Sequence, residues 1–160
     1  GRGIWVGAVR STIDAAINQN LFNRAARTDV NIPENLSKNI ECQLLERVQG
    51  YLSLARKAWQ AIAGYEKVLE NVSKGGFALV LTASDASFNA QKKLSSLATG
   101  LVQVDCLSGS EMGVVFGRER TAHAAVAIGG LASQIKIDGR RLAEFRGKPS
   151  LNEVRHDAEV

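Results

Sequence analysis

The sequence predicts an α/β fold: a three-layer α/β/α sandwich with a mixed central sheet of about four strands, plus a short N-terminal strand-helix appendage. Two observations lead to this class. Apolar runs bounded by turn residues alternate along the chain with amphipathic helical segments. One run, "FALVLTA" from Phe77 to Ala83, is apolar almost throughout, which is typical of a strand covered on both faces. Helices are therefore expected on both sides of the sheet.

The leading segment has the pattern of a strand followed by a helix. "GRGIWV", Gly1 to Val6, predicts a short strand, and Ser11 with Asp14 forms an S-x-x-D capping pair ahead of an apolar stripe at helical spacing. The stretch from Arg27 to Leu36 is polar, contains a proline and lacks periodicity, which predicts a linker. The predicted boundaries are an N-terminal segment at 1–31, a linker at 32–35, a main domain at 36–146 and a polar tail, expected to be disordered, at 147–160.

The first half of the main domain combines long helical and short extended segments. From Leu36 to Trp59, apolar residues recur every three or four positions, which predicts a long amphipathic helix. Ala61 to Ala63 leaves room for a very short strand. The apolar spacing from Tyr65 to Val72 predicts a second helix, which Gly75 would end. The buried strand at Phe77–Ala83 follows.

The second half repeats this alternation. A helix over 90–98 should stop at a glycine and lead into a strand at Leu101–Leu107. Ser108 and Glu111 form a capping box for a short helix. The remaining elements are a strand over Arg120–Ile128 and a helix over Leu131–Phe145, in which Asp138-Gly139 is a pair that can kink or divide the helix.

Composition favours a soluble, cytoplasmic protein without a cofactor, a metal site or a catalytic centre. Hydrophobic residues make up 45% of the 160, but no apolar run approaches the roughly 20 residues that a membrane span needs, and the N-terminus lacks a secretory signal. Cys42 and Cys106 are isolated and are expected to be buried, and the sequence gives His123 and His156 no catalytic partner. The net charge of +4 mildly favours a polyanionic partner.

Several motifs resemble known RNA-binding modules. The segments "GYEKVLENVSKGGFALVLTASDAS", "SEMGVVFGRERTAHAAVAI" and "GGLA" make residues 36–146 similar to the kink-turn-binding ribosomal protein family typified by archaeal ribosomal protein L-seven-Ae, whose superfamily includes the Gadd-type stress proteins. Separately, "GRGIWV" through "LFNRAAR" resembles the C-terminal half of the bacterial YlxR-type domain, without that domain's N-terminal half. The two resemblances cover nearly the whole chain.

The ribosomal-protein resemblance implies noncatalytic binding of structured RNA, either kink-turn-like or ribosomal. In that family RNA meets the start of the second domain helix and the loop before the last strand. The family's Asn-Glu or Lys-Gln pair is replaced here by Glu66-Lys67, which implies altered or weakened kink-turn selectivity, because a carboxylate accepts but does not donate hydrogen bonds. The implied RNA-binding residues are Gly64, Tyr65, Glu66, Lys67, Arg118, Glu119, Arg120, Thr121 and Ala122, with accessory contacts from Arg2, Arg10, Arg24, Arg27 and Lys38.

Each of these features also has an ordinary structural interpretation. Gly64 can be a turn glycine, and Glu66 and Lys67 can be part of a solvated helix face. Trp5 can belong to a core. Arg118 and Arg120 can pair with nearby glutamates. The rival function is a Gadd-like protein-protein interaction module, which predicts an exposed apolar patch, with Trp59 or Trp5 as candidate members, and weak salt dependence. RNA binding predicts a basic patch and an affinity that falls steeply with salt.

Overall fold

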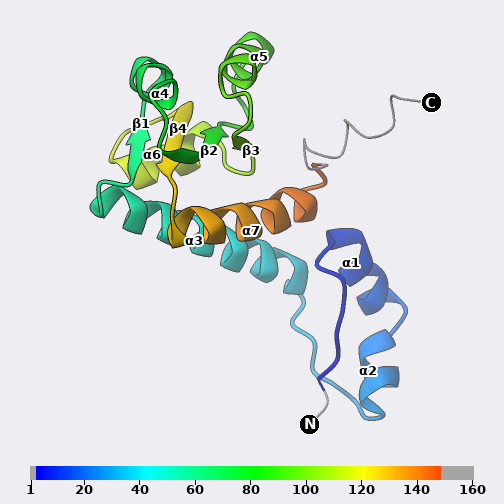
Figure 1. The fold of residues 1–160 in the computed structure, drawn as a ribbon. Coiled ribbons are helices and arrows are strands. Elements are labelled where there is room, and N and C mark those ends of the chain that lie inside the picture. Colours follow the sequence, from blue (N-terminus) through cyan, green and yellow to red (C-terminus); the bar gives the residue numbers. More distant parts are fainter. Residues whose placement is uncertain (1–2, 149–160) are drawn as a thin grey trace, which may run out of the picture.

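The computed structural model describes residues 3–148, apart from the side chains of Ser95 and Leu97. Within this range the chain forms a mixed α/β fold with seven helices and one four-stranded sheet (Figure 1). In chain order the elements are α1 (Arg10–Asn18), α2 (Leu21–Ala26), α3 (Leu36–Lys57), β1 (Ala61–Ala63), α4 (Tyr65–Val72), β2 (Phe77–Thr82), α5 (Phe88–Leu97), β3 (Val102–Val104), α6 (Gly109–Phe116), β4 (His123–Ala127) and α7 (Gly130–Phe145).

The sheet is mixed and lies between two layers of helices, which confirms the predicted sandwich. Its strand order is β1-β4-β2-β3; β2 runs parallel to β3, whereas β4 runs antiparallel to β1 and β2. Helices α4 and α5 cover one face, and α3 and α7 cover the other (Figure 1). Because successive side chains of a strand point to opposite faces, Leu79 and Leu81 pack towards α3 and α7 while Val80 packs towards α4 and α5.

Local signals set several element boundaries. The predicted capping box of α6 is confirmed: the Ser108 side chain accepts a hydrogen bond from Glu111 N, and the Glu111 carboxylate accepts one from Ser108 N at 2.8 Å. Two strands are shorter than predicted, since β3 covers only Val102–Val104 and β4 only His123–Ala127. In the described sheet β3 is an edge strand that pairs with β2 alone, so its hydrogen bonding ends where that register ends.

Helix α7 is continuous through Asp138 and Gly139, so these residues neither kink nor divide it. A Cβ on Gly139 would lie 3.0 Å from Val104 Cγ1, which shows that the glycine allows close packing of α7 on β3. The buried Asp138 carboxylate accepts hydrogen bonds from Arg47 at 2.9 Å and from Arg141 at 3.0 Å. Both residues therefore serve packing between α3, α7 and the sheet.

The leading segment differs from its prediction. Residues 3–6 form no strand, because no strand of the sheet lies beside them (Figure 1); Gly1 and Arg2 lie outside the described residues. The expected single helix is two, α1 and α2, since Asn20 adopts a left-handed conformation with φ 55°. The Ser11–Asp14 capping pair is also wrong: α1 begins at Arg10 without a side-chain cap, and Asp14 accepts a hydrogen bond from Ser37.

A group of charged side chains, which we call the Arg146 cluster, ties α1 to the main domain; it consists of Arg10, Glu41, Glu111 and Arg146. Arg146 donates to Glu41 at 2.9 Å, to both carboxylate oxygens of Glu111 at 2.9 and 2.8 Å, and to the Cys106 carbonyl at 2.7 Å. Arg10 pairs with Glu41. The hydrogen bonds and charges of Glu111 and Glu41 raise the pKa of Arg146. The leading segment is thus held to the rest of the chain by paired charges, and Ile13 and Ala16 of α1 are buried.

The segments expected to be irregular are described only in part. Residues 27–35, between α2 and α3, contain no helix or strand. Of the predicted tail at 147–160, Gly147 and Lys148 are described, and Lys148 N donates to the Ala143 carbonyl at 2.9 Å. Positions 149–160 lie outside the described residues.

Candidate nucleic-acid interface

Gly64 forms the junction between β1 and α4. It is the N-cap residue of α4 with φ +108°, a conformation that favours glycine. Its N–H donates to the His123 carbonyl at 2.9 Å, which fixes the start of α4 against β4. The Tyr65 ring lies 5.6 Å from the His123 ring, and Glu66 and Lys67 follow as exposed residues of the first turn. Gly64 is therefore a turn glycine that also places Lys67 at the surface.

The loop after α6 brings one of its two arginines to this junction. Helix α6 ends at Phe116, and its C-cap Gly117 has φ +66°. The chain then folds back so closely that a Cβ on Gly113 would lie 2.5 Å from the Arg118 carbonyl oxygen. A Cβ on Gly64 would lie 3.7 Å from Arg118 Nη1. The guanidinium group of Arg118 is thus next to the backbone at the start of α4.

The second arginine points elsewhere. Arg120 donates to the Asp85 carboxylate at 2.8 Å and to the Asp85 carbonyl at 3.2 Å, in the loop between β2 and α5. The hydrogen bond from Gly109 N, and then the bond and charge of Arg120, lower the pKa of Asp85. A Cβ on Gly109 would lie 2.8 Å from Arg120 side-chain atoms, so the arginine also packs on the start of α6. The structure gives Arg120 a partner within the protein.

The other loop residues lead the chain into β4. Glu119 is exposed, whereas Thr121 is buried and its N–H donates to the Gly109 carbonyl at 2.8 Å. The half-buried Ala122 accepts a hydrogen bond from Ala83 N at 2.8 Å. Among the described residues, two buried side-chain atoms have no hydrogen-bond partner, Thr121 Oγ1 and His123 Nδ1, and burial lowers the pKa of His123. These residues shape the protein interior below the loop.

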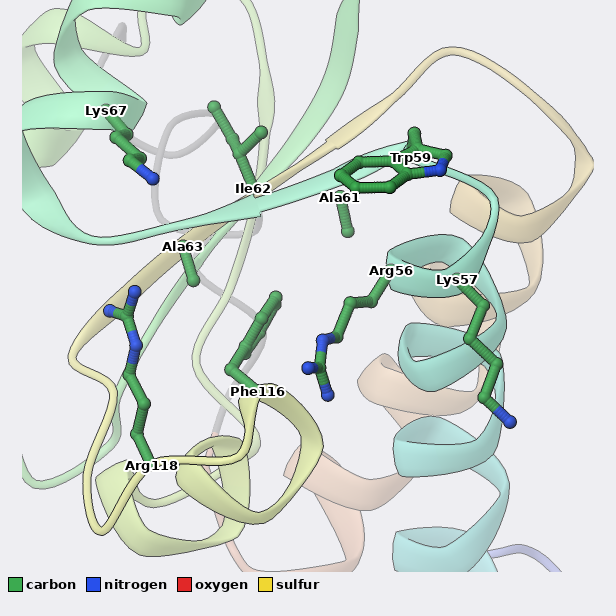
Figure 2. Close-up of a pocket in the computed structure, with 9 residues that line it drawn as sticks. All are labelled: Arg56, Lys57, Trp59, Ala61, Ile62, Ala63, Lys67, Phe116 and Arg118. Carbon is green, nitrogen blue, oxygen red and sulfur yellow. The ribbon is translucent and has the colours of Figure 1, made fainter.

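The start of α4 and the loop border an open cavity of about 560 Å³, which we call the basic hollow. Its far side is formed by the end of α3, which the sequence did not assign to RNA binding. Figure 2 shows Lys67, Arg118 and Arg56 around the opening beside β1, with the Phe116 ring between the two arginines and the Trp59 indole over Ala61. The lining residues are Arg56, Lys57, Trp59, Ala61, Ile62, Ala63, Lys67, Phe116 and Arg118.

The basic hollow carries positive charge that residues 3–148 do not neutralise with carboxylates of their own. Four of its lining residues are cationic and none is acidic. Arg56 donates to the Val115 carbonyl at 2.7 Å, which holds its guanidinium group in place. Within residues 3–148, Lys57, Lys67 and Arg118 form no ion pair with a carboxylate. Arginine forks and lysine ammonium groups in such a setting suit phosphate oxygens.

The four expected accessory residues that the structure describes lie far from the basic hollow. Arg10 belongs to the Arg146 cluster, Arg24 and Arg27 are exposed at α2, and Lys38 is exposed at the start of α3. Because α3 has 22 residues, its two ends are about 30 Å apart, and the hollow is at the opposite end. Arg2 lies outside the described residues. The structure does not bring these four described accessory residues and the main site into one patch.

The structure also describes the two cysteines, the grouping of possible metal ligands and the polarity of the helices. Cys106 is buried as predicted, and desolvation raises its pKa to about 12, whereas Cys42 is exposed, contrary to expectation. Within residues 3–148, no group of three or more His, Cys, Asp or Glu side chains is arranged so that it could hold a metal ion. In the same range, each helix is too short or too polar to span a bilayer.

Comparison with known proteins shows the fold. No family model matches the sequence, and no curated protein sequence matches it. A protein of unknown function from Bacillus halodurans is similar over 58% of this chain and 96% of its own, with a TM-score of 0.55 and 23% identity. A 15.5 kD RNA-binding protein from Giardia lamblia is similar over 66% of this chain and 89% of its own, with a TM-score of 0.50 and 16% identity.

At these identities the likeness shows a shared fold, and one protein with that fold binds RNA. The kink-turn and YlxR-type resemblances stay predictions. The comparisons thus agree with the mixed α/β architecture of the chain and with its similarity to an RNA-binding protein.

Proposed function

We propose that this protein is a noncatalytic, cytoplasmic RNA-binding protein. It binds structured RNA, kink-turn-like or ribosomal, between the start of α4 and the loop at 117–122. The observation that carries the proposal is the unneutralised positive charge of the basic hollow, to which both predicted regions contribute a cation, Lys67 and Arg118. The shared fold with an RNA-binding protein supports it.

We expect the residues of the proposed interface to have different tasks. Gly64 leaves the backbone open to close approach, and the first N–H groups of α4 offer donors to phosphate or base acceptors. Arg118 and Lys67 supply charge to the RNA backbone. Glu66 can accept from guanine N1 or N2 but cannot donate to O6, so we expect weaker discrimination of kink-turns than an amide pair would give.

The test is binding of a labelled RNA helix interrupted by a kink-turn with sheared G·A pairs, compared with an uninterrupted duplex of equal length. Lys67→Glu and Arg118→Glu should each weaken binding about tenfold or more at low salt, because each replaces an attraction to phosphate by a repulsion. Both side chains are exposed, so thermal unfolding should not change.

Lys93→Glu is the matched control, because Lys93 is exposed on α5, away from the strand β1 that lines the hollow. Charge reversal there alters net charge equally and should alter affinity little. Wild-type affinity in the Lys67→Glu, Arg118→Glu double variant, or an equal loss in Lys93→Glu, would reject this interface.

A protein-protein interaction module is the second candidate, and one observation favours it. Trp5 is 95% exposed and lies near the exposed Ile4 on the leading segment, so the expectation that Trp5 is a core residue is wrong. An affinity that hardly changes between low and high salt would favour this function over RNA binding.

A further inference from the structure

Trp59 occupies a backbone position that normally belongs to glycine. It is the first residue beyond the C-cap of α3, with φ +60°. The Gln60 N–H donates to the Ala55 carbonyl at 2.8 Å, and the Trp59 N–H donates to the Arg56 carbonyl at 3.1 Å. These two bonds define a Schellman motif, whose left-handed residue is usually glycine because any side chain there is strained. The local backbone thus disfavours a bulky aromatic side chain at position 59.

The tertiary structure gives no packing reason for the tryptophan either. Trp59 is 94% exposed, and the residues from Arg56 to Gln60 around it are exposed as well. A tryptophan that stabilises a fold buries its ring, and an exposed one leaves a large apolar surface in water. Residues held in a strained conformation without a structural benefit point to a functional role.

The surroundings of the indole indicate its ligand. Trp59 lines the basic hollow together with Phe116 and four cations, two of which, Arg56 and Lys57, belong to the same helix end (Figure 2). A ligand that matches this site combines a flat apolar surface with negative charge. A nucleotide has both, and a base stacks on an aromatic ring without regard to its identity. An acidic peptide would meet the cations but would leave the flat ring without an equivalent partner.

We propose that Trp59 stacks on an unpaired base of the bound RNA, while Lys57 and Lys67 hold the phosphates on either side of it. The inference rests on the proposed function and deepens it: the RNA substrate carries at least one unpaired nucleotide beside its structured part. The side chains that line the pocket include no amide or carboxylate to read adenine or cytosine edges. Stacking on Trp59 does not depend on the identity of the base, so this contact should tolerate any base.

The first experiment uses the two tryptophans separately. In a Trp5→Phe variant, Trp59 is the sole tryptophan. Its fluorescence, excited at a wavelength that the tyrosines do not absorb, is followed during titration with a hexauridylate and with an abasic ribose-phosphate hexamer of equal charge. Stacking predicts quenching by the hexauridylate and about tenfold weaker binding of the abasic hexamer. The reciprocal Trp59→Phe variant, in which only Trp5 reports, should show little quenching. Quenching of Trp5 instead of Trp59, or equal binding of the two hexamers, would overturn the proposal.

The second experiment separates this inference from the proposed function. Wild type, Trp59→Gly and Trp59→Phe are compared on a kink-turn RNA with and without a four-nucleotide single-stranded extension. Trp59→Gly should bind the extended RNA about tenfold more weakly than wild type, and Trp59→Phe should retain most of the affinity. On the RNA without the extension, the difference in affinity between the three proteins should be smaller.

The outcomes are distinct. Equal affinity of wild type and Trp59→Gly for the extended RNA, with binding still lost in Arg118→Glu, would overturn the stacking site and leave the proposed function standing. Absence of wild-type binding to either structured RNA would overturn both. Glycine suits the backbone at position 59, so loss of binding by Trp59→Gly cannot be assigned to unfolding.

Discussion

The two ends of α3 use the same type of residue in opposite ways. At its start, Arg10 and Arg146 meet the carboxylates of Glu41 and Glu111, and the Arg146 cluster is closed and neutralised. At its end, Arg56 and Lys57 face Lys67 and Arg118 across an open hollow without a lining carboxylate. The first arrangement holds the leading segment to the main domain, and the second leaves charge available to an anionic ligand.

This difference separates structural arginines from arginines that can bind. Both kinds lie at helix ends and contribute equally to the net charge of the sequence. Only their partners distinguish them, since an arginine with a bidentate carboxylate has its donors occupied. Arg118 and Arg120, two residues apart, show the same contrast within one loop.

The largest expected effect comes from disrupting the Arg146 cluster at the start of α3. Arg146→Met removes the charge but keeps much of the volume, and it leaves Glu41 and Glu111 partly buried without their main partner. We expect the free energy of unfolding to fall by about 3 kcal/mol in urea denaturation. Arg56→Met at the open end removes one hydrogen bond to a carbonyl and should cost about 1 kcal/mol or less. Equal losses would contradict the distinction between the two ends.

Acid should weaken the closed end selectively. Burial raises the pKa of Glu111, but hydrogen bonds from Arg146 and Ser108 outweigh burial and lower it below its usual value of 4.5. A lowered folded-state pKa means that ionised Glu111 stabilises the fold above about pH 4.5, and that this contribution is lost as pH falls through the folded-state pKa. Urea midpoints measured between pH 7 and pH 3 should therefore drop less in Arg146→Met than in wild type. Parallel curves would show that the cluster does not contribute.

At the end of α3 that borders the basic hollow, a substitution of Trp59 is expected to have a smaller effect on the free energy of unfolding, and of opposite sign. Trp59→Gly relieves the left-handed strain and should raise the free energy of unfolding by up to about 1 kcal/mol. Ala58→Gly, one residue earlier with φ −84°, offers no such relief and should lower it. Thermal denaturation of the two variants side by side checks the sign. A destabilised Trp59→Gly protein would mean that the indole supports the fold after all.

The smallest effect concerns salt. Lys57→Ala should reduce the slope of log affinity against log salt by about one for a structured RNA, because one phosphate contact is lost. Lys38→Ala, at the other end of the same helix, should leave the slope unchanged. A change of slope in Lys38→Ala alone would place the RNA at the start of α3 instead of at the basic hollow.

The sequence was sufficient for most of the architecture. Periodicity and capping signals located the helices of the main domain, and the apolar run at Phe77–Ala83 identified the central strand β2. The sequence predictions were wrong where contacts with distant residues determine the local structure. Residues 3–6 cannot form a strand without a neighbouring strand, and Asp14 accepts a hydrogen bond from Ser37 on α3 instead of capping its own helix.

The site was less accessible from sequence than the fold. Lys67 and Arg118 were found through motifs, and the structure brings both to one hollow. Arg56 and Lys57 were missed as site residues because they read as the basic last turn of a helix, which is common for electrostatic reasons. The one clue was Trp59 itself, a bulky residue directly after a helix where a glycine stop is usual.

Strand β1 sets the width of the proposed binding surface. Its three residues, about 10 Å of extended chain hydrogen-bonded to β4, are nearly all that separates the Trp59 turn from the first turn of α4. Both walls are thereby preorganised, and a nucleotide entering between them would lose its own conformational entropy without requiring the protein to rearrange. Association would then proceed near the rate of oriented diffusional encounter, and differences in affinity between RNAs would appear mainly as differences in residence time.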